Sequence, residues 1–424
     1  MRFRLLFLFL LGGFHSLTQD IQYARRVVEL LTDQGMHGRG YVKDGHKIAA
    51  NFIASEFEHF GLQSFSLDYQ QPFPLKVNTF PGKLKLQIDD KKLEPGSDFL
   101  VDPSSPSVKG KFEILRLDLD TLLSNTKEWV KIIKTTDKAI LFDKTGTEDL
   151  PSEDQVIINQ LSEVFKFNKE LNAPVYIEVS SDKLTWGTSS ELTPRTILRI
   201  KNSSVDSLNT KRTKLNIQNE YLTDYYSQNV IGLIEGERTD SVIMVTAHYD
   251  HLGRMGSKTF FPGANDNASG VAMLLNIARH FSFSEKPPFS MVFIAFGGEE
   301  AGLLGSQYYR DRPLYPLERV KFLLNLDIVG TGDEGITVVN GKVYQKQFEL
   351  LSNLNEGLIP EIKPRGAACN SDHCPFDQVG VPNFFIYTRG GIQAYHDIYD
   401  KGSTLPLTEF EDLFVLLVSF LKEV

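Results

Sequence analysis

Two adjacent glutamates, Glu299 and Glu300, follow the continuous apolar run 291–296 and a pair of glycines. A strand that is covered on both faces has no polar face, so it reads as an unbroken hydrophobic run. In an open α/β sheet, ligands bind beyond the carboxyl ends of the strands, which places both glutamates at the expected active edge. Most Glu-Glu pairs lie on solvated helix faces, but the apolar run before this pair indicates a functional site instead.

Imidazoles and further carboxylates occur at four other places, which are His248-Tyr249-Asp250, Asp266 in the loop 262–270, Asp327 after the run 322–326, and His396 in a late loop. One such residue at a strand end is usually structural, whereas five such segments in one chain favour a common site. Imidazole nitrogen and carboxylate oxygen, with no thiolate, are ligands that suit catalytic Zn²⁺ or a similar divalent ion.

These motifs, in this order, resemble the co-catalytic dizinc exopeptidases typified by bacterial leucyl aminopeptidase, which form metallopeptidase family 28. The matching segments are 248–250, 263–270, 296–306, 325–327, 371–373 and 395–396. The resemblance covers residues 219–424 strongly and 20–75 moderately. Glutamate carboxypeptidase, transferrin receptor and glutaminyl cyclase are relatives of the same family.

The resemblance implies two Zn²⁺ ions and a role for each candidate residue. The implied ligands are Asp266 as the bridge, Glu300 and His396 at one ion, and His248 and Asp327 at the other. Glu299 would then be the general base that acts on a metal-activated water, and Asp250 would orient a ligand imidazole. The family also implies a cis peptide bond between Asp266 and Asn267.

Residues 365–395 are expected to form the rim of the substrate pocket, with Asp372, Tyr387, Arg389 and Tyr395 as substrate-binding candidates. A free α-amine favours a carboxylate partner, while a free α-carboxylate favours arginine. Both partner types are present, so the residues alone leave the specificity open. The frequency of activities in the family favours an aminopeptidase that removes N-terminal residues from peptides.

Three other activities fit the same resemblance. A glutamate carboxypeptidase-like hydrolase would keep the same ions, whereas a glutaminyl cyclase would hold a single zinc, so metal stoichiometry separates the two. A non-catalytic ectodomain like the transferrin receptor would have lost its ligands. The intact ligand set and Glu299 argue against that third alternative.

Composition and the first residues bear on partners and location. The chain has 424 residues and a net charge of −9, and no basic cluster stands out in the sequence, which argues against nucleic acid as a partner. Residues 1–18 combine two arginines with a short Leu/Phe-rich run, as in a secretory signal peptide, so we expect export to the periplasm or the medium. The run is too short for a stable membrane anchor.

The chain contains two cysteines, Cys369 and Cys374. In an exported protein we expect a disulfide between them, whereas a cytosolic protein would keep two buried thiols. A loop this short can be closed only where the backbone geometry suits it.

The order of apolar runs predicts an α/β fold, namely a three-layer, mixed and largely parallel twisted sheet with helices on both faces. We expect an N-terminal helical part over 19–75, an inserted β-rich or mixed, lid-like domain over 76–218, and the catalytic domain over 219–424. In the catalytic parts the expected strands are 230–234, 242–247, 291–296, 322–328, 336–339 and 383–387, and the expected helices are 20–33, 46–60, 271–280 and 407–424. In the insertion the expected strands are 83–88, 139–142, 173–179 and 196–200, with a helix over 154–171.

Overall fold

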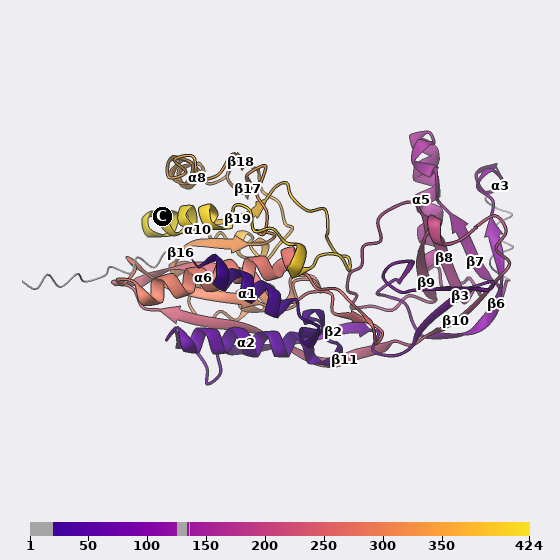
Figure 1. The fold of residues 1–424 in the computed structure, drawn as a ribbon, viewed down its shortest axis with the longest axis horizontal. Coiled ribbons are helices and arrows are strands. Elements are labelled where there is room, and N and C mark those ends of the chain that lie inside the picture. Colours follow the sequence, from indigo (N-terminus) through magenta and orange to yellow (C-terminus); the bar gives the residue numbers. More distant parts are fainter. Residues whose placement is uncertain (1–19, 125–133, 135) are drawn as a thin grey trace, which may run out of the picture.

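The computed structural model describes residues 20–124, 134 and 136–424, so the expected signal peptide lies outside the described residues. Figure 1 shows two lobes side by side, each built on its own sheet. The large lobe contains a nine-stranded sheet, and the small lobe, formed by residues 84–217, contains an eight-stranded sheet. A short hairpin of β13 (Arg254–Met255) and β14 (Thr259–Phe260) lies apart from both sheets.

The large sheet has the strand order β1-β11-β15-β12-β16-β19-β17-β18, and β2 pairs with the outer part of β11. Its central strands β15, β12, β16 and β19 are parallel. β11 runs antiparallel to β15, and β17 runs antiparallel to β19 but parallel to the edge strand β18. The strands are β1 (Gln63–Ser64), β2 (Gln70–Thr79), β11 (Glu220–Ile234), β12 (Arg238–His248), β15 (Phe289–Phe296), β16 (Val320–Leu326), β17 (Ile336–Val339), β18 (Ile362–Pro364) and β19 (Asn383–Thr388).

Helices cover both faces of this sheet, which explains why its strands are apolar throughout. In β12, Ile243 and Val245 pack in one core, while Val242 and Met244 pack in a second core on the opposite face. The first core includes residues of α1 (Ile21–Leu31), α2 (Gly45–His59), α6 (Ser269–Phe283), α8 (Gln345–Asn353) and α10 (Phe410–Glu423). The second includes residues of α7 (Leu304–Asp311) and α9 (Cys374–Asp377). The predicted three-layer α/β fold is therefore confirmed.

The small sheet has the order β4-β3-β10-β6-β7-β8-β9-β5, in which β6 to β9 are parallel and the remaining pairs are antiparallel. Its strands are β3 (Leu84–Ile88), β4 (Lys91–Leu93), β5 (Phe99–Val101), β6 (Val108–Leu117), β7 (Ala139–Asp143), β8 (Val175–Ser180), β9 (Thr196–Lys201) and β10 (Arg212–Ile217). The helices α3 (Leu119–Ser124) and α5 (Ser152–Phe167) belong to this lobe.

Two features join the lobes. β2 and β11 form a long antiparallel ribbon that runs from the large sheet toward the small lobe (Figure 1). In addition, Leu252, Met255 and Phe261 of the large lobe lie in the hydrophobic core of the small lobe, beside Phe80 and Trp186. The two lobes therefore share a core.

The structure corrects some expected elements. The strand expected over 322–328 ends at Leu326, so Asp327 lies beyond the ladder. The strand expected over 230–234 is only the last third of β11, and β2 was missed, because both contain many polar residues. In β2 buried and exposed residues alternate, as in a sheet with one solvated face.

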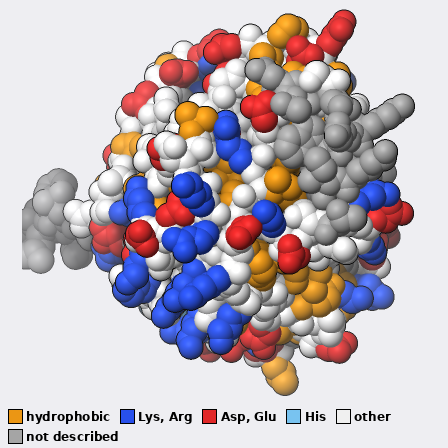
Figure 2. Space-filling model, turned by 90° about the vertical axis from the view of Figure 1, so that its right-hand side faces the viewer, with side chains coloured by type: hydrophobic (Ala, Val, Ile, Leu, Met, Phe, Trp, Pro, Cys, Tyr) orange, Lys and Arg blue, Asp and Glu red, His pale blue; other side chains and the backbone are white. Residues whose placement is uncertain are grey.

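Lysines and arginines gather on the outer end of the small lobe (Figure 2). Lys111 lies opposite Lys214, and Lys109 and Lys85 both lie opposite Asn216 on neighbouring strands. The sequence shows no such cluster because these residues come from three separate strands. Among the described residues, no helix has the length and apolarity needed to cross a membrane.

Candidate metal centre

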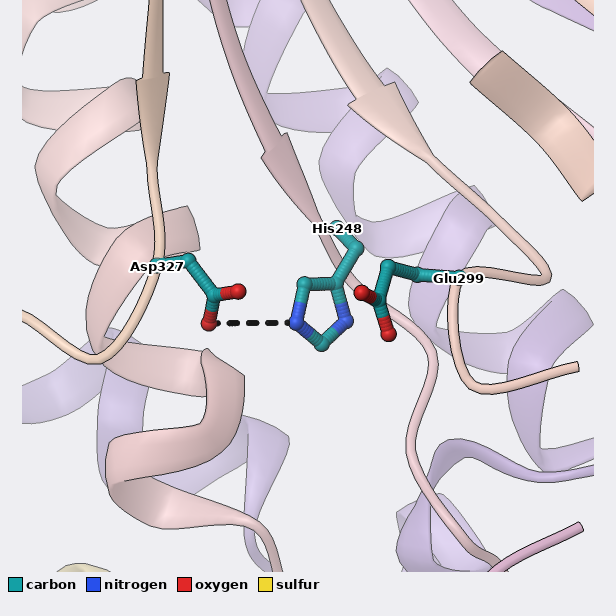
Figure 3. A group of neighbouring side chains, drawn as sticks. All are labelled: His248, Glu299 and Asp327. Atoms are coloured by element: carbon teal, nitrogen blue, oxygen red, sulfur yellow. Dashed lines mark hydrogen bonds and ion pairs between the residues drawn. The ribbon is translucent and has the colours of Figure 1, made fainter. Parts of the chain in front are cut away.

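Three parallel strands bring the predicted residues to one edge of the large sheet. His248 is the last residue of β12, which lies between β15 and β16, and it pairs in register with Phe296 of β15. Glu299 follows β15 after two glycines, and Asp327 directly follows β16. Figure 3 shows the Glu299 carboxylate and the Asp327 carboxylate on either side of the His248 imidazole. These contacts require the parallel order of the three strands.

Asp266 lies between two histidine–carboxylate pairs. Its Oδ1 is 3.3 Å from His248 Nε2, and its Oδ2 is 3.0 Å from His396 Nε2. His248 Nε2 is also 3.3 Å from Asp327 Oδ1, and His396 Nε2 is 3.3 Å from Glu300 Oε2. One carboxylate thus faces two separate groups, each of which contains one imidazole and one further carboxylate.

Two sets of three side chains are close enough to hold a cation. In His248, Glu299 and Asp327, and again in His251, Asp266 and Glu300, one ligand atom from each residue lies within 4.8 Å of the others. His251 was not predicted, although it directly follows the motif His248-Tyr249-Asp250. Its Nδ1 lies 2.8 Å from Glu300 Oε1 within the second set.

The loop that carries Asp266 is fixed by buried polar groups. The Asp266–Asn267 peptide bond is cis, as the resemblance implied. The Asp400 carboxylate accepts hydrogen bonds from the backbone N–H groups of Asn265 at 2.9 Å and Asp266 at 3.1 Å. The buried guanidinium of Arg39 donates to the carbonyls of Pro262 and Gly263, both at 2.6 Å, just before this loop.

Asp327 is held by a chain of side-chain hydrogen bonds that crosses the sheet. The Ser371 hydroxyl donates to Asp327 Oδ2 at 2.9 Å, and the Asn325 amide donates to the Ser371 oxygen at 2.9 Å. The Thr246 hydroxyl donates to the Asn325 amide oxygen at 2.8 Å. This chain leaves Asp327 Oδ1 facing His248.

The neighbouring glutamates Glu299 and Glu300 have opposite electrostatic surroundings. Removal from water, reinforced by the negative charges of Glu300 and Asp372, raises the pKa of Glu299 well above its usual value. Burial also disfavours the charge of Glu300, but hydrogen bonds from His251 and His396 outweigh it and lower the pKa of Glu300 to about 2. Two carboxyl groups whose pKa values are separated in this way can take different roles, one staying ionised and the other exchanging protons.

Asp250 contacts both Glu299, the candidate for proton transfer, and His248, a candidate metal ligand. Its Oδ1 accepts the backbone N–H of Glu299 at 3.1 Å and lies 3.8 Å from His248 Nδ1. Burial raises the pKa of Asp250 to about 7, while the nearby His248 opposes that rise. The carboxylate thus fixes the Glu299 backbone, while the backbone carbonyl of Asp250, 3.2 Å from His248 Nδ1, orients the His248 ring.

The donor set fits zinc. Imidazole nitrogens and carboxylate oxygens are common Zn²⁺ ligands, and Asp266 presents one oxygen to each histidine. Asp266, although buried, has a pKa held well below its usual value by hydrogen bonds with His248 and His396. An ionised carboxylate in this position is the form that binds a cation.

The four substrate-binding candidates differ in their distance from this centre. Asp372 is fully buried beside His248, and burial raises its pKa to about 7. Tyr395 stacks on the His396 ring with 4.0 Å between ring centroids, and it is 46% exposed. Within the described part of the chain, no hydrogen bond or ion pair joins Tyr387 or Arg389 to the centre. Arg389 pairs instead with Glu361.

Cys369 and Cys374 form the predicted disulfide. The bond closes the loop that carries Ser371, Asp372 and His373. It therefore restrains the segment that holds Asp327.

Comparison with known proteins identifies the part of the chain that carries the centre. A family model described as peptidase family M28 matches residues 229–420.

Residues 229–420 belong to peptidase family M28.

Aminopeptidase YwaD of Bacillus subtilis (strain 168) is 32% identical to this chain over 192 residues, which are 44% of this chain and 40% of that protein. Leupeptin-inactivating enzyme 1 of Streptomyces exfoliatus is 32% identical over 156 residues, which are 36% of this chain and 34% of that enzyme. The chain thus spans less than half the length of these curated relatives.

Solved structures match the M28 domain together with the small lobe. The zinc aminopeptidase BSAP from Bacillus subtilis has a TM-score of 0.68 at 21% identity, covering 94% of this chain and 93% of its own. A peptidase M28 precursor from Shewanella amazonensis SB2B has a TM-score of 0.66 at 18% identity, and the match covers 95% of this chain and 97% of that chain. At these identities the likeness shows a shared fold.

Proposed function

We propose that this chain is a zinc-dependent exopeptidase, namely an aminopeptidase that removes N-terminal residues from peptides. The observation that carries the proposal is the position of Asp266, whose two oxygens face His248 and His396 separately. A carboxylate that serves two imidazole–carboxylate groups is suited to bridge two cations. The aminopeptidase name of a relative that is 32% identical supports the same activity.

The proposed ligands divide into two sets that share Asp266. His248 and Asp327 would complete one site, and Glu300 and His396 the other. When bound, the two zinc ions would polarise the scissile carbonyl and make water a better nucleophile.

Glu299 is proposed as the general base. Its carboxylate would accept a proton from the attacking water and then donate that proton to the nitrogen of the leaving amine. Its raised pKa favours the second step, and the hydrogen bond from its backbone N–H to Asp250 fixes its position. Because Glu300 contacts both His251 and His396, Glu299 is the glutamate left for proton transfer.

Charge favours an aminopeptidase over a carboxypeptidase. A carboxypeptidase needs a cation for the α-carboxylate, and the predicted candidate Arg389 already pairs with Glu361. We further propose that the protein is exported, which the Cys369–Cys374 disulfide supports.

The test measures zinc per chain and the hydrolysis of aminoacyl-anilides with free and with blocked α-amines. We expect two zinc ions and cleavage of the free-amine substrates only. Glu299→Gln should retain both ions and lower kcat by roughly 10² to 10⁴-fold, the usual contribution of a general base. Glu300→Gln is the matched control, because a ligand variant should lose zinc as well as activity.

Other results would favour the alternatives. Two ions with cleavage only of substrates that have a free α-carboxylate would keep the site and reject the aminopeptidase. One zinc with cyclisation of N-terminal glutamine would indicate a glutaminyl cyclase. A protein without zinc or hydrolysis would match the receptor-like alternative.

A further inference from the structure

A segment of the small lobe, residues 183–188, contacts the loop that carries His396. This segment, here called the docking segment, lies between β8 and β9. It contacts residues 393–397 of the large lobe through side-chain and backbone hydrogen bonds and one ion pair. The small lobe therefore reaches the proposed metal centre itself.

The backbone of Trp186 binds His396 on two sides. The Trp186 N–H donates to the His396 carbonyl at 2.8 Å, and His396 Nδ1 lies 3.1 Å from the Trp186 carbonyl. If His396 Nε2 binds the proposed zinc ion beside Asp266 and Glu300, the proton of the neutral ring lies on Nδ1, where the Trp186 carbonyl accepts it. A carbonyl in this place sets the tautomer and the orientation of a ligand histidine.

Lys183 fixes the chain on both sides of His396. Its ammonium donates to the carbonyls of Gln393 at 2.7 Å and Tyr395 at 3.1 Å, and it pairs with Asp397 at 2.6 Å. The Asp397 side chain is only 5% exposed. His396 itself has a φ of 52°, a left-handed conformation that the surrounding contacts must maintain.

Thr188 extends the contact to a second proposed ligand, because its hydroxyl donates to the backbone carbonyl of Glu300. The docking segment is in turn anchored in the small lobe. The Trp186 indole N–H donates to the Val101 carbonyl of β5 at 2.7 Å, and its ring stacks on Phe261 with 4.7 Å between centroids. The segment is therefore held by the core that both lobes share.

We infer that the docking segment positions the zinc site formed by Asp266, Glu300 and His396, and that Lys183 is its main positioning side chain. The inference rests on the proposed function. It also separates the two ions, because the docking segment contacts His396 and Glu300, whereas His248 and Asp327 are fixed by groups of the large lobe. Loosening the docking segment should therefore weaken the binding of one zinc ion and leave the binding of the other unchanged.

The experiment compares the full-length wild type with Lys183→Met, Lys183→Arg and Lys138→Met. Lys138 is the matched control, because it forms an ion pair with Glu113 in the same lobe and is 43% exposed, against 44% for Lys183. Zinc affinity is measured by competition with a chromogenic chelator. We expect Lys183→Met to bind one zinc ion roughly 10- to 100-fold more weakly than the wild type, which is the usual effect of removing a group that orients a metal ligand. The affinity for the other zinc ion should be unchanged. Lys183→Arg should recover most of the affinity, and Lys138→Met should match the wild type.

Thr188→Val provides a second, nearly isosteric variant that removes only the hydroxyl next to Glu300. When one cobalt ion replaces the more weakly bound zinc ion, the visible absorption spectrum of Thr188→Val should differ from that of the wild type with the same replacement. Equal thermal unfolding of the metal-free variants would show that the effects are not a general loss of stability.

Three outcomes overturn the inference. In the first, both zinc affinities are unchanged in Lys183→Met and in Thr188→Val. In the second, Lys183→Met loses affinity equally for both zinc ions. In the third, Lys138→Met loses as much zinc affinity as Lys183→Met. In each of these cases a wild type with two ions and full activity would leave the proposed function standing. A wild type that binds no zinc would reject both.

Discussion

Glu299 and Glu300 are adjacent in the sequence and chemically identical, yet their carboxylates have different partners. Glu300 accepts hydrogen bonds from two imidazoles, whereas Glu299 lies near the single imidazole of His248 and near other acids. The neighbouring loops cause this difference, since His251 and His396 come from two separate segments. From sequence alone, the resemblance was the only basis for assigning one glutamate as ligand and the other as base. The structure gives the two carboxylates different surroundings, and the assignment of one as ligand and the other as base stays a prediction.

His46 is a residue at which acid should lower the stability. It is buried at the start of α2, where it packs against Tyr41 and Tyr225, and burial lowers its pKa to about 4. An unfolded histidine has a pKa of about 6.5, so below that pH the unfolded chain binds the proton first. The stabilisation is therefore complete above pH 6.5 and is lost as the pH falls toward 4, by up to about 3 kcal/mol.

Urea unfolding of the metal-free protein between pH 4.5 and 7.5 measures this loss. His46→Gln should flatten the decline in unfolding free energy across that range, because the variant has no imidazole at this position. His59→Gln is the control, since His59 lies on the same helix but is exposed. An equal pH dependence in wild type and His46→Gln would show that other groups cause the acid sensitivity.

At the scale of elements, one buried arginine joins three segments of the chain, one of which leads into the Asp266 loop of the candidate metal centre. Besides the two carbonyls before the Asp266 loop, the Arg39 guanidinium donates to the carbonyl of Leu31 at the end of α1 and that of Tyr249 after β12. Burial lowers its pKa to about 10, so it stays charged at neutral pH. A lysine has no planar fork and cannot reach all of these acceptors.

We expect Arg39→Lys to destabilise the protein by about 3 to 5 kcal/mol, because buried carbonyls would lose their donors. Thermal unfolding in the presence and absence of zinc measures the change. Arg238→Lys serves as the control, since Arg238 forms an exposed ion pair with Asp240 whose loss should change stability by less than about 1 kcal/mol. Equal stabilities for the two variants would show that the Arg39 hydrogen bonds are not important to the fold.

The ends of the apolar strands were the most predictable feature of this protein. His248, Glu299 and Asp327 follow runs whose hydrophobicity reveals a buried parallel strand, so their meeting at one edge follows from the sheet order. Arg39 and Asp400 gave no comparable signal, because each acts on backbone groups far away in the sequence. Periodicity reports burial within one element, and it carries no information about a side chain that satisfies the carbonyls of another.

For the whole molecule, the sequence suggested a lid-like insertion, and the shared core points to a closer attachment. The short β-branched runs of residues 76–218 indicated a separate β-rich or mixed region, which agrees with the eight-stranded sheet. This sequence pattern did not reveal that Met255 and Phe261, at the hairpin β13–β14, pack among residues of the small lobe. The basic end of this lobe was also invisible, because its lysines are spread over three strands.

A shared core should make the two lobes unfold together. Phe261 is fully buried between them, so Phe261→Ala should destabilise the protein by about 3 to 5 kcal/mol through the cavity it leaves. Phe165 is buried in a second core whose described members all come from the small lobe, so Phe165→Ala disturbs that lobe alone. If the lobes form one cooperative unit, calorimetry should give one transition for the wild type, and both variants should lower its midpoint. Two resolved transitions, with only one midpoint lowered by Phe165→Ala, would mean that the small lobe unfolds independently. The contacts around Phe261 would then be too weak to couple the small lobe to the large lobe, which carries the candidate metal centre.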